Sequence, residues 1–196
     1  MNFFKKIFKT QPPQKKDVKT EHSQSLSLDD LFVKNFIDKG GRFLYCQSKE
    51  EINENLLNIL ELETWQKPLI FSEKLNKLTQ NLSLNTSNDI ANCDCFITKC
   101  EHLIAEDGSI LFSSKQLKEH LLPIFPQNFI VFAKTSQLVH NKGESLTGVK
   151  NRYPKNCIPS NIAAIKSYNP LNESDDFMNY GNNNTKQLYL LLLEDL

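Results

Sequence analysis

The segment 98–110 holds the side chains that are best suited to chemistry. It reads TKCEHLIAEDGSI, with Thr98, Glu106, Asp107 and Gly108 between apolar stretches. Loops that follow strands in α/β proteins commonly form ligand sites, and a carboxylate there can exchange protons with a ligand. The same residues also fit a hairpin with a polar tip, because Asp-Gly favours a tight turn. The residue types leave a ligand site and a plain turn equally open.

Glu106 is the candidate catalytic residue, and Thr98, Asp107 and Gly108 are candidate ligand-binding residues. Glu106 follows an apolar stretch, so its carboxylate could line a shallow polar pocket with Thr98. Asp107 adds a second negative charge, which shifts the pKa of a neighbouring carboxyl group if both face inward. The structural alternative is that Glu106 fixes its loop near Ser160 through hydrogen bonds to the backbone.

Cysteine and histidine do not form a recognisable metal motif. Zinc and iron–sulfur sites usually draw on CxxC pairs, whereas this chain has Cys93, Cys95 and Cys100 without a second pair. The four histidines form neither HxxxH nor HExxH. We expect no metal and interpret Cys93 and Cys95 as buried strand residues. The less favoured alternative is a Cys100–His102 nucleophile pair on one strand face.

Alternating helices and strands must position these groups. Helices are predicted to begin near residues 28, 48 and 72, with strands at 42–46 and 68–71 between them. Further strands are predicted at 93–98, 102–105, 109–112, 129–133 and 188–193, and a helix at 143–153 with Leu146 and Val149 facing inward. Ser160 is expected to cap a helix over 162–167. Such alternation predicts a mainly parallel sheet with helical crossovers.

Composition narrows the class of protein. The 196 residues fit one domain, and 23 basic residues against 23 acidic ones argue against nucleic-acid binding through phosphate contacts. No apolar run approaches the roughly 18 residues of a membrane-spanning helix. The six glycines form neither GxGxxG nor a P-loop, so we expect no dinucleotide cofactor. Five scattered cysteines favour reduced thiols and a cytoplasmic location.

The N-terminal stretch differs from the rest of the chain. Residues 1–26 are Lys-rich and carry adjacent prolines, so we expect a flexible tail before an α/β domain over 27–196. Phe3, Phe4, Ile7 and Phe8 could line one side of a short helix with lysines beside them. Docking to a membrane surface or a partner is therefore an alternative to a frayed terminus.

Several motifs, in order, resemble the LUD domain family of lactate utilisation proteins of the LutC type. That family carries T-x-[AC]-x-x-x-I-A-E-T-G-[TS]-I. This chain matches it at Thr98, Cys100, Ile104, Ala105, Glu106, Gly108, Ser109 and Ile110. The family's L-L-P and next strand match 121–131. Pro159 and Ser160 match its later S-G-P-S motif, which makes Ser160 a further candidate ligand-binding residue. The resemblance covers about 30–196.

The second motif also departs from the family. Its Gly, Thr, Asp and Glu are replaced by Ile158, Ile162, Ala164 and Lys166, which removes candidate acid, base or ligand groups. An Asn-rich stretch over 169–186 replaces a short glycine-containing link. The half of the site built on Glu106 is retained.

The resemblance implies both a fold and a function. The implied fold is the NagB/RpiA/CoA-transferase-like one, a Rossmann-like three-layer α/β/α sandwich. The implied function is an accessory subunit in the oxidation of L-lactate to pyruvate, with iron–sulfur partner proteins supplying the clusters. The alternatives are a stand-alone small-molecule enzyme or binder that uses Glu106, and a non-catalytic interaction module.

Overall fold

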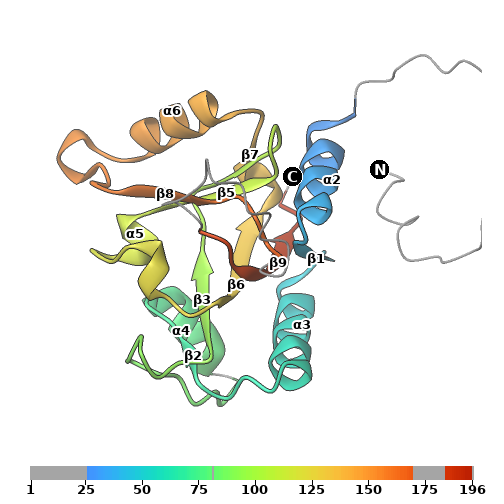
Figure 1. Cartoon of the computed structure of the whole chain (residues 1–196), viewed down its shortest axis with the longest axis vertical. Coiled ribbons are helices and arrows are strands. Elements are labelled where there is room, and N and C mark those ends of the chain that lie inside the picture. Colours follow the sequence, from blue (N-terminus) through green and yellow to red (C-terminus); the bar gives the residue numbers. More distant parts are fainter. Residues whose placement is uncertain (1–25, 81, 170–183, 196) are drawn as a thin grey trace, which may run out of the picture.

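The computed structural model describes residues 26–80, 82–169 and 184–195 (Figure 1). Almost all of the predicted tail 1–26, and most of the Asn-rich stretch 169–186, lie outside these residues. None of the described helices is long and apolar enough to cross a membrane. The elements are α2 (Leu28–Asp38), β1 (Arg42–Cys46), α3 (Lys49–Leu62), β2 (Pro68–Leu69), α4 (Glu73–Gln80), β3 (Cys95–Lys99), β4 (His102–Ile104), β5 (Ser109–Ser113), α5 (Ser114–Leu117), η1 (Leu122–Ile124), β6 (Asn128–Lys134), η2 (Thr135–Gln137), β7 (Leu138–Val139), α6 (Lys142–Arg152), η3 (Lys155–Cys157), β8 (Ile162–Ile165) and β9 (Gln187–Leu193).

A five-stranded parallel sheet forms the centre, in the order β1-β9-β6-β3-β2. The last strand, β9, lies between β1 and β6 rather than at an edge. It pairs with β6 from Asn128↔Gln187 to Lys134↔Leu193 and with β1 from Arg42↔Tyr189 to Cys46↔Leu193. Its apolar sequence fits this place, because an inner strand of a parallel sheet is covered on both faces. The prediction of a buried strand at 188–193 is confirmed.

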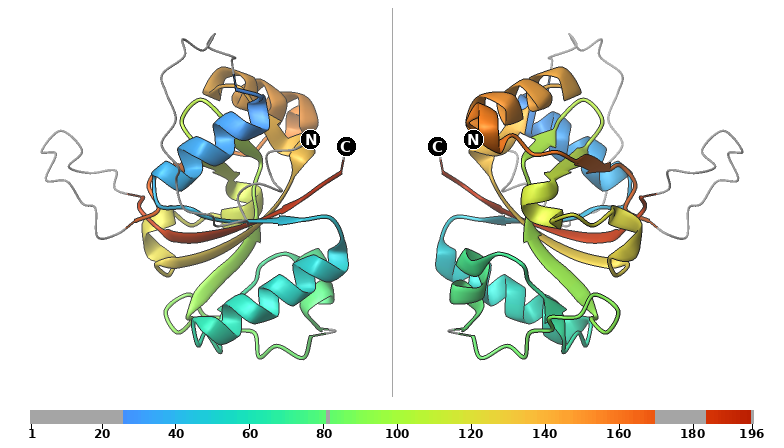
Figure 2. Two further views of the ribbon diagram at one scale, coloured as in Figure 1. Left: turned by 90° about the vertical axis from the view of Figure 1, so that its right-hand side faces the viewer. Right: turned by 90° about the vertical axis from the view of Figure 1, so that its left-hand side faces the viewer.

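Helices α3 and α4 cover one face of the central sheet (Figure 2). Ser48 caps α3 by accepting a hydrogen bond from the Glu51 backbone N–H at 3.1 Å, as its capping-box sequence predicts. Leu56 of α3 and Leu75 of α4 pack on Ile97 and Ile130 of the sheet, all at most 2% exposed. Burial of these apolar faces holds both helices on the sheet.

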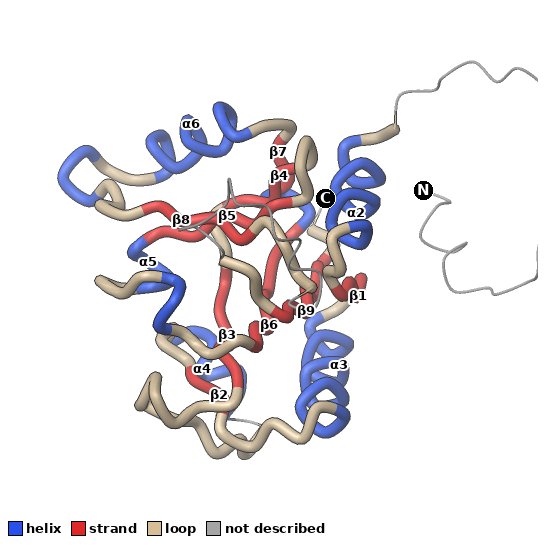
Figure 3. The backbone as a smooth tube through the Cα atoms, viewed as in Figure 1, coloured by secondary structure: helices blue, strands red, loops and turns tan. Residues whose placement is uncertain are grey.

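The opposite face is covered by α2 and by a second, four-stranded sheet in the order β7-β4-β5-β8 (Figure 3). Phe32 and Phe36 of α2 lie in one core with Phe129 of β6 and Phe112 of β5. Helix α6 packs on the outside of the small sheet through Val149. The chain is therefore a mixed α/β sandwich with a mainly parallel central sheet flanked by helices, as predicted.

Three local predictions are wrong. The segment expected to be a helix over 162–167 forms strand β8, which pairs antiparallel with β5 from Ser113↔Ile162 to Ile110↔Ile165. Its Ile-Ala-Ala-Ile sequence is compatible with either a helix or a strand. The segment becomes a strand because it pairs with the edge of β5. Leu146 is 39% exposed rather than inward, whereas Val149 is buried. Cys93 precedes β3 and is only partly buried, with its thiol donating to the Ile90 carbonyl.

Cys95 gives a direct test of the central sheet. It is fully buried in β3, so Cys95→Ser puts a hydroxyl where a thiol packs against apolar side chains. We expect the free energy of unfolding to fall by about 1–3 kcal/mol in urea denaturation. Cys157→Ser, at an exposed thiol, is the matched control and should leave stability unchanged. Equal effects of the two substitutions would contradict this packing.

Candidate functional site

The structure brings Glu106, Asp107 and Gly108 together in the turn between β4 and β5, but it places Thr98 and Ser160 elsewhere. Thr98 lies within β3 of the central sheet, 4% exposed. Ser160 lies near the Ser113 end of β5, since the Ser114 N–H donates to the Asn161 carbonyl. The turn lies at the Ser109 end, roughly 14 Å away at about 3.4 Å per residue. Ligand binding by all five residues stays a prediction, but they do not line one cavity.

Hydrogen bonds and close packing hold the turn against α2. The Asn35 side-chain amide donates to the Ala105 carbonyl at 2.8 Å and to the Glu106 carbonyl at 3.2 Å. The Asp107 carboxylate accepts from the Ser109 N–H at 3.0 Å. Gly108 has φ +65°, and a Cβ there would lie 2.6 Å from backbone atoms of α2. The turn residues thus have a local structural role, while the Glu106 side chain is exposed.

Gly108→Ala tests that close approach. The added methyl group meets helix backbone and the positive φ is unfavourable for alanine, so we expect a loss of about 2 kcal/mol or more in stability. Gly143→Ala is the matched control, because its Cβ would meet only the end of the Asn141 side chain at 3.2 Å. In thermal unfolding, we expect the midpoint temperature of Gly143→Ala to equal or exceed that of the wild-type protein. Similar midpoints for both variants would show that α2 does not constrain the turn.

A buried carboxylate that the sequence analysis did not single out lies just beyond β3. Glu101 is fully buried. Its Oε1 accepts from Ser113 at 2.6 Å, Gln116 at 2.9 Å and Tyr153 at 2.9 Å, and its Oε2 accepts from Arg152 at 2.8 Å. Burial alone would raise the pKa of Glu101, but these hydrogen bonds and the Arg152 charge hold it below its ordinary 4.5. The contacts tie β3 to β5, α5 and α6.

His102 extends this cluster toward the end of β6. Burial and the neighbouring Arg152 charge lower the pKa of His102, despite its contact with a carbonyl. The Arg152 guanidinium can only donate hydrogen bonds, and it lies 3.4 Å from Nε2 of His102. The Nε2 atom is therefore unprotonated, and the proton of the neutral ring is on Nδ1. Nδ1 donates to the Gln137 carbonyl at 3.2 Å. Gln137 in turn donates to the Cys100 and Glu101 carbonyls at 2.7 and 3.1 Å. The cluster therefore positions Gln137.

Gln137 lies at the wall of a cavity of about 180 Å³ at the carboxyl ends of the central strands. Lys99 ends β3, Lys134 ends β6, and Lys49 and Lys74 stand in the first turns of α3 and α4. Apolar side chains complete the lining: Ile52, Leu75, Phe132, Ala133 and Leu193. The sequence signal was available, because lysines follow two predicted strands and begin two predicted helices.

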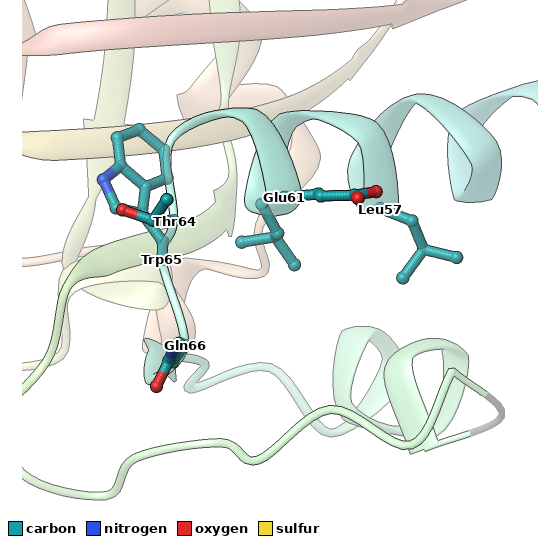
Figure 4. A pocket seen from close by; sticks show the side chains of 6 residues that line it. Leu57, Glu61, Thr64, Trp65 and Gln66 are labelled. Atoms are coloured by element: carbon teal, nitrogen blue, oxygen red, sulfur yellow. The ribbon is translucent and has the colours of Figure 1, made fainter.

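A second hollow, shown in Figure 4, has fewer charged side chains that could bind or react with a ligand. Its lining comes from the last turns of α3 and the residues after it, within 57–66. Among the described residues that line it, only Glu61 is charged. Trp65 beside it packs edge-on against Tyr189, with ring centroids 6.1 Å apart. We therefore place the candidate site at the lysine-lined cavity and treat the Glu101 cluster as its support.

Glu101→Gln tests the cluster. A carboxyl group whose pKa is lowered on folding adds stability above its unfolded pKa, and that stability is lost as the pH falls through the folded pKa. Wild-type stability should decline on acidification below about 4.5, and the variant should decline less. At pH 7 we expect the variant to lose about 1–3 kcal/mol in denaturant titrations. Parallel pH profiles for both proteins would be inconsistent with an ionised, hydrogen-bonded Glu101.

Comparisons with known proteins agree with this architecture. The LUD domain model matches residues 61–193. A crystal structure of a DUF162 family protein from Deinococcus radiodurans is similar in fold, with a TM-score of 0.57 at 12% identity over 87% of this chain and 99% of that chain. No curated protein matches the chain. Since the family model covers more than half of the sequence, the chain belongs to the LUD domain family.

Proposed function

We propose that the chain is an accessory subunit in the oxidation of L-lactate to pyruvate, acting in the cytoplasm with iron–sulfur partner proteins. Membership of the LUD domain family supports a role associated with lactate utilisation. Burial raises the pKa of the Cys95 thiol, and it raises that of Cys100 to about 12. Iron–sulfur clusters are held by several converging thiolates, whereas Cys95 and Cys100 lie in two different hydrophobic cores, which supports assigning the iron–sulfur clusters to the partners.

The observation that carries an accessory role is the contact between Lys166 and Asp107. The second family motif has Glu where this chain has Lys166, and here the Lys166 ammonium lies 3.8 Å from the Asp107 carboxylate. A position that could have added a third carboxyl group to the turn instead holds a positive charge. General acid–base catalysis needs a positioned group that is available to the ligand, whereas the Asp107 carboxylate here faces the Lys166 ammonium.

A stand-alone enzyme or binder is the second candidate, and the lysine-lined cavity favours it. An enzyme of this kind would use Glu106 as acid, base or nucleophile in the retained half of the family motif, with Thr98, Asp107, Gly108 and Ser160 as ligand contacts. None of these residues lines the lysine-lined cavity, so the cavity supports small-molecule binding and not this choice of catalytic residue. The third candidate, a non-catalytic interaction module, fits the structural roles of Asp107 and Gly108. These three functions differ in what they require of Glu106 and of partners.

Deletion of the gene in the native host tests the lactate role. We expect growth on L-lactate to be lost and growth on pyruvate to be retained, because only the oxidation step is removed. A tagged full chain should co-purify with proteins that show iron–sulfur absorbance. Normal growth of the deletion strain on L-lactate would contradict the proposal, whereas lactate-dependent growth without cluster-bearing partners would favour the stand-alone enzyme.

Glu106→Gln separates the accessory role from catalysis. The Glu106 side chain is exposed, so the variant should keep the wild-type thermal midpoint. An accessory subunit should also complement the deletion strain fully, since only one surface charge is lost. If stability is unchanged and growth on L-lactate is abolished, Glu106 is functional and the accessory proposal fails. Ser160→Ala provides a second exposed site for comparison.

A further inference from the structure

The lysine-lined cavity concentrates positive charge that few acidic groups balance. Lys134 pairs with Asp195 at 2.9 Å. Among the described residues, Lys49, Lys74 and Lys99 have no carboxylate within 4.0 Å. The acids of the same helical turns, Glu50, Glu51 and Glu73, do not line the cavity, and Glu51 accepts from the Gln47 N–H. Three ammonium groups therefore surround one hollow without an ionic partner in the part of the chain that the structure describes.

The electrostatics of Lys99 agree with this geometry. Burial lowers the pKa of Lys99 below its ordinary 10.5, and the charges of Lys74 and Lys134 lower it further. The ammonium groups are thus close enough to repel one another. An anion in the cavity would relieve this repulsion, because opposite charges nearby favour the protonated form.

The backbone also contributes positive electrostatic potential at the cavity. Helices α3 and α4 begin at this cavity, and the first N–H groups of a helix lack partners within it and carry partial positive charge. The cavity also lies beyond the carboxyl ends of parallel strands, where ligands of open α/β sheets bind. The lysine charges, the first turns of α3 and α4 and the carboxyl ends of the central strands therefore all lie at this cavity.

We propose that the cavity binds the phosphate group of a small organic phosphate. Lysines act on phosphate as point charges, whereas planar carboxylates are matched best by arginine forks. Arg42 and Arg152 do not line the cavity. The apolar floor, with Phe132 and Leu193, receives the organic part of the ligand. At about 180 Å³ the cavity is smaller than the roughly 300–1,000 Å³ typical of drug-sized ligands, so the ligand is small.

This proposal is independent of the lactate role, because it rests on the cavity alone. Binding of phenyl phosphate to the full chain tests it by isothermal titration calorimetry at fixed ionic strength. Benzoate presents the same ring with a carboxylate, inorganic phosphate lacks the apolar part, and L-lactate is the third comparison. We expect phenyl phosphate to bind at least tenfold more tightly than each of them.

Substitutions locate the binding. Lys99→Gln and Lys74→Gln should each weaken phenyl phosphate binding about tenfold, and Lys155→Gln, at an exposed lysine outside the cavity, should leave it within twofold. Circular dichroism and thermal midpoints show whether the variants remain folded; Lys74 is exposed on α4, so its substitution should not disturb folding. Benzoate binding as tight as phenyl phosphate overturns the ligand class. Equal weakening by all three substitutions, or no binding, overturns the site.

Discussion

The insertion of β9 between β1 and β6 is the constraint on which the rest of the structure depends. Its register with both neighbours runs over Gln187–Leu193 against β6 and Tyr189–Leu193 against β1. This pairing brings the end of the chain into the middle of the sheet and makes all five strands parallel. The carboxyl ends of β3, β6 and β9 then meet at one edge, where Lys99, Lys134 and Leu193 line the same cavity.

The small sheet depends on the same arrangement. The chain leaves β3 at Lys99, forms β4 and β5, and returns to the centre at β6. The buried Glu101 stands at this exit, where its hydrogen bonds to Ser113, Tyr153 and Arg152 join the small sheet and α6 to the end of β3. Burying a carboxylate is costly unless it is fully hydrogen-bonded, so this cluster fixes how the two sheets meet.

Much of the fold could be predicted from local patterns. The capped helix starts at Ser27 and Ser48, the apolar run at 188–193 and the Asp107-Gly108 turn all correspond to observed elements. The error at 162–167 arose because Ile and Ala in a short run do not distinguish a helix from a strand. Pairing with β5 decides that segment, and such a long-range contact leaves no local signal.

The candidate site was harder to predict, because its residues come from distant parts of the chain. The motif around Glu106 predicts a ligand site at a turn whose Asp107 and Gly108 have structural contacts, within the turn and against α2. In the sequence, each lysine that lines the cavity has the context of an ordinary surface residue: Lys49, Lys74, Lys99 and Lys134. Only the strand order shows that they share an edge of the sheet. Glu101 has no local sequence signal, because its hydrogen-bond partners lie at 113, 116, 152 and 153 and meet it only in the folded chain.

A crystal structure of the full chain grown with phenyl phosphate most directly tests where the functional site lies. We expect phosphate density within hydrogen-bonding distance of the Lys99 ammonium, with the ring against Phe132. Phosphate bound instead beside the 105–108 turn, or a cavity that stays empty while the ligand binds elsewhere on the chain, would contradict it.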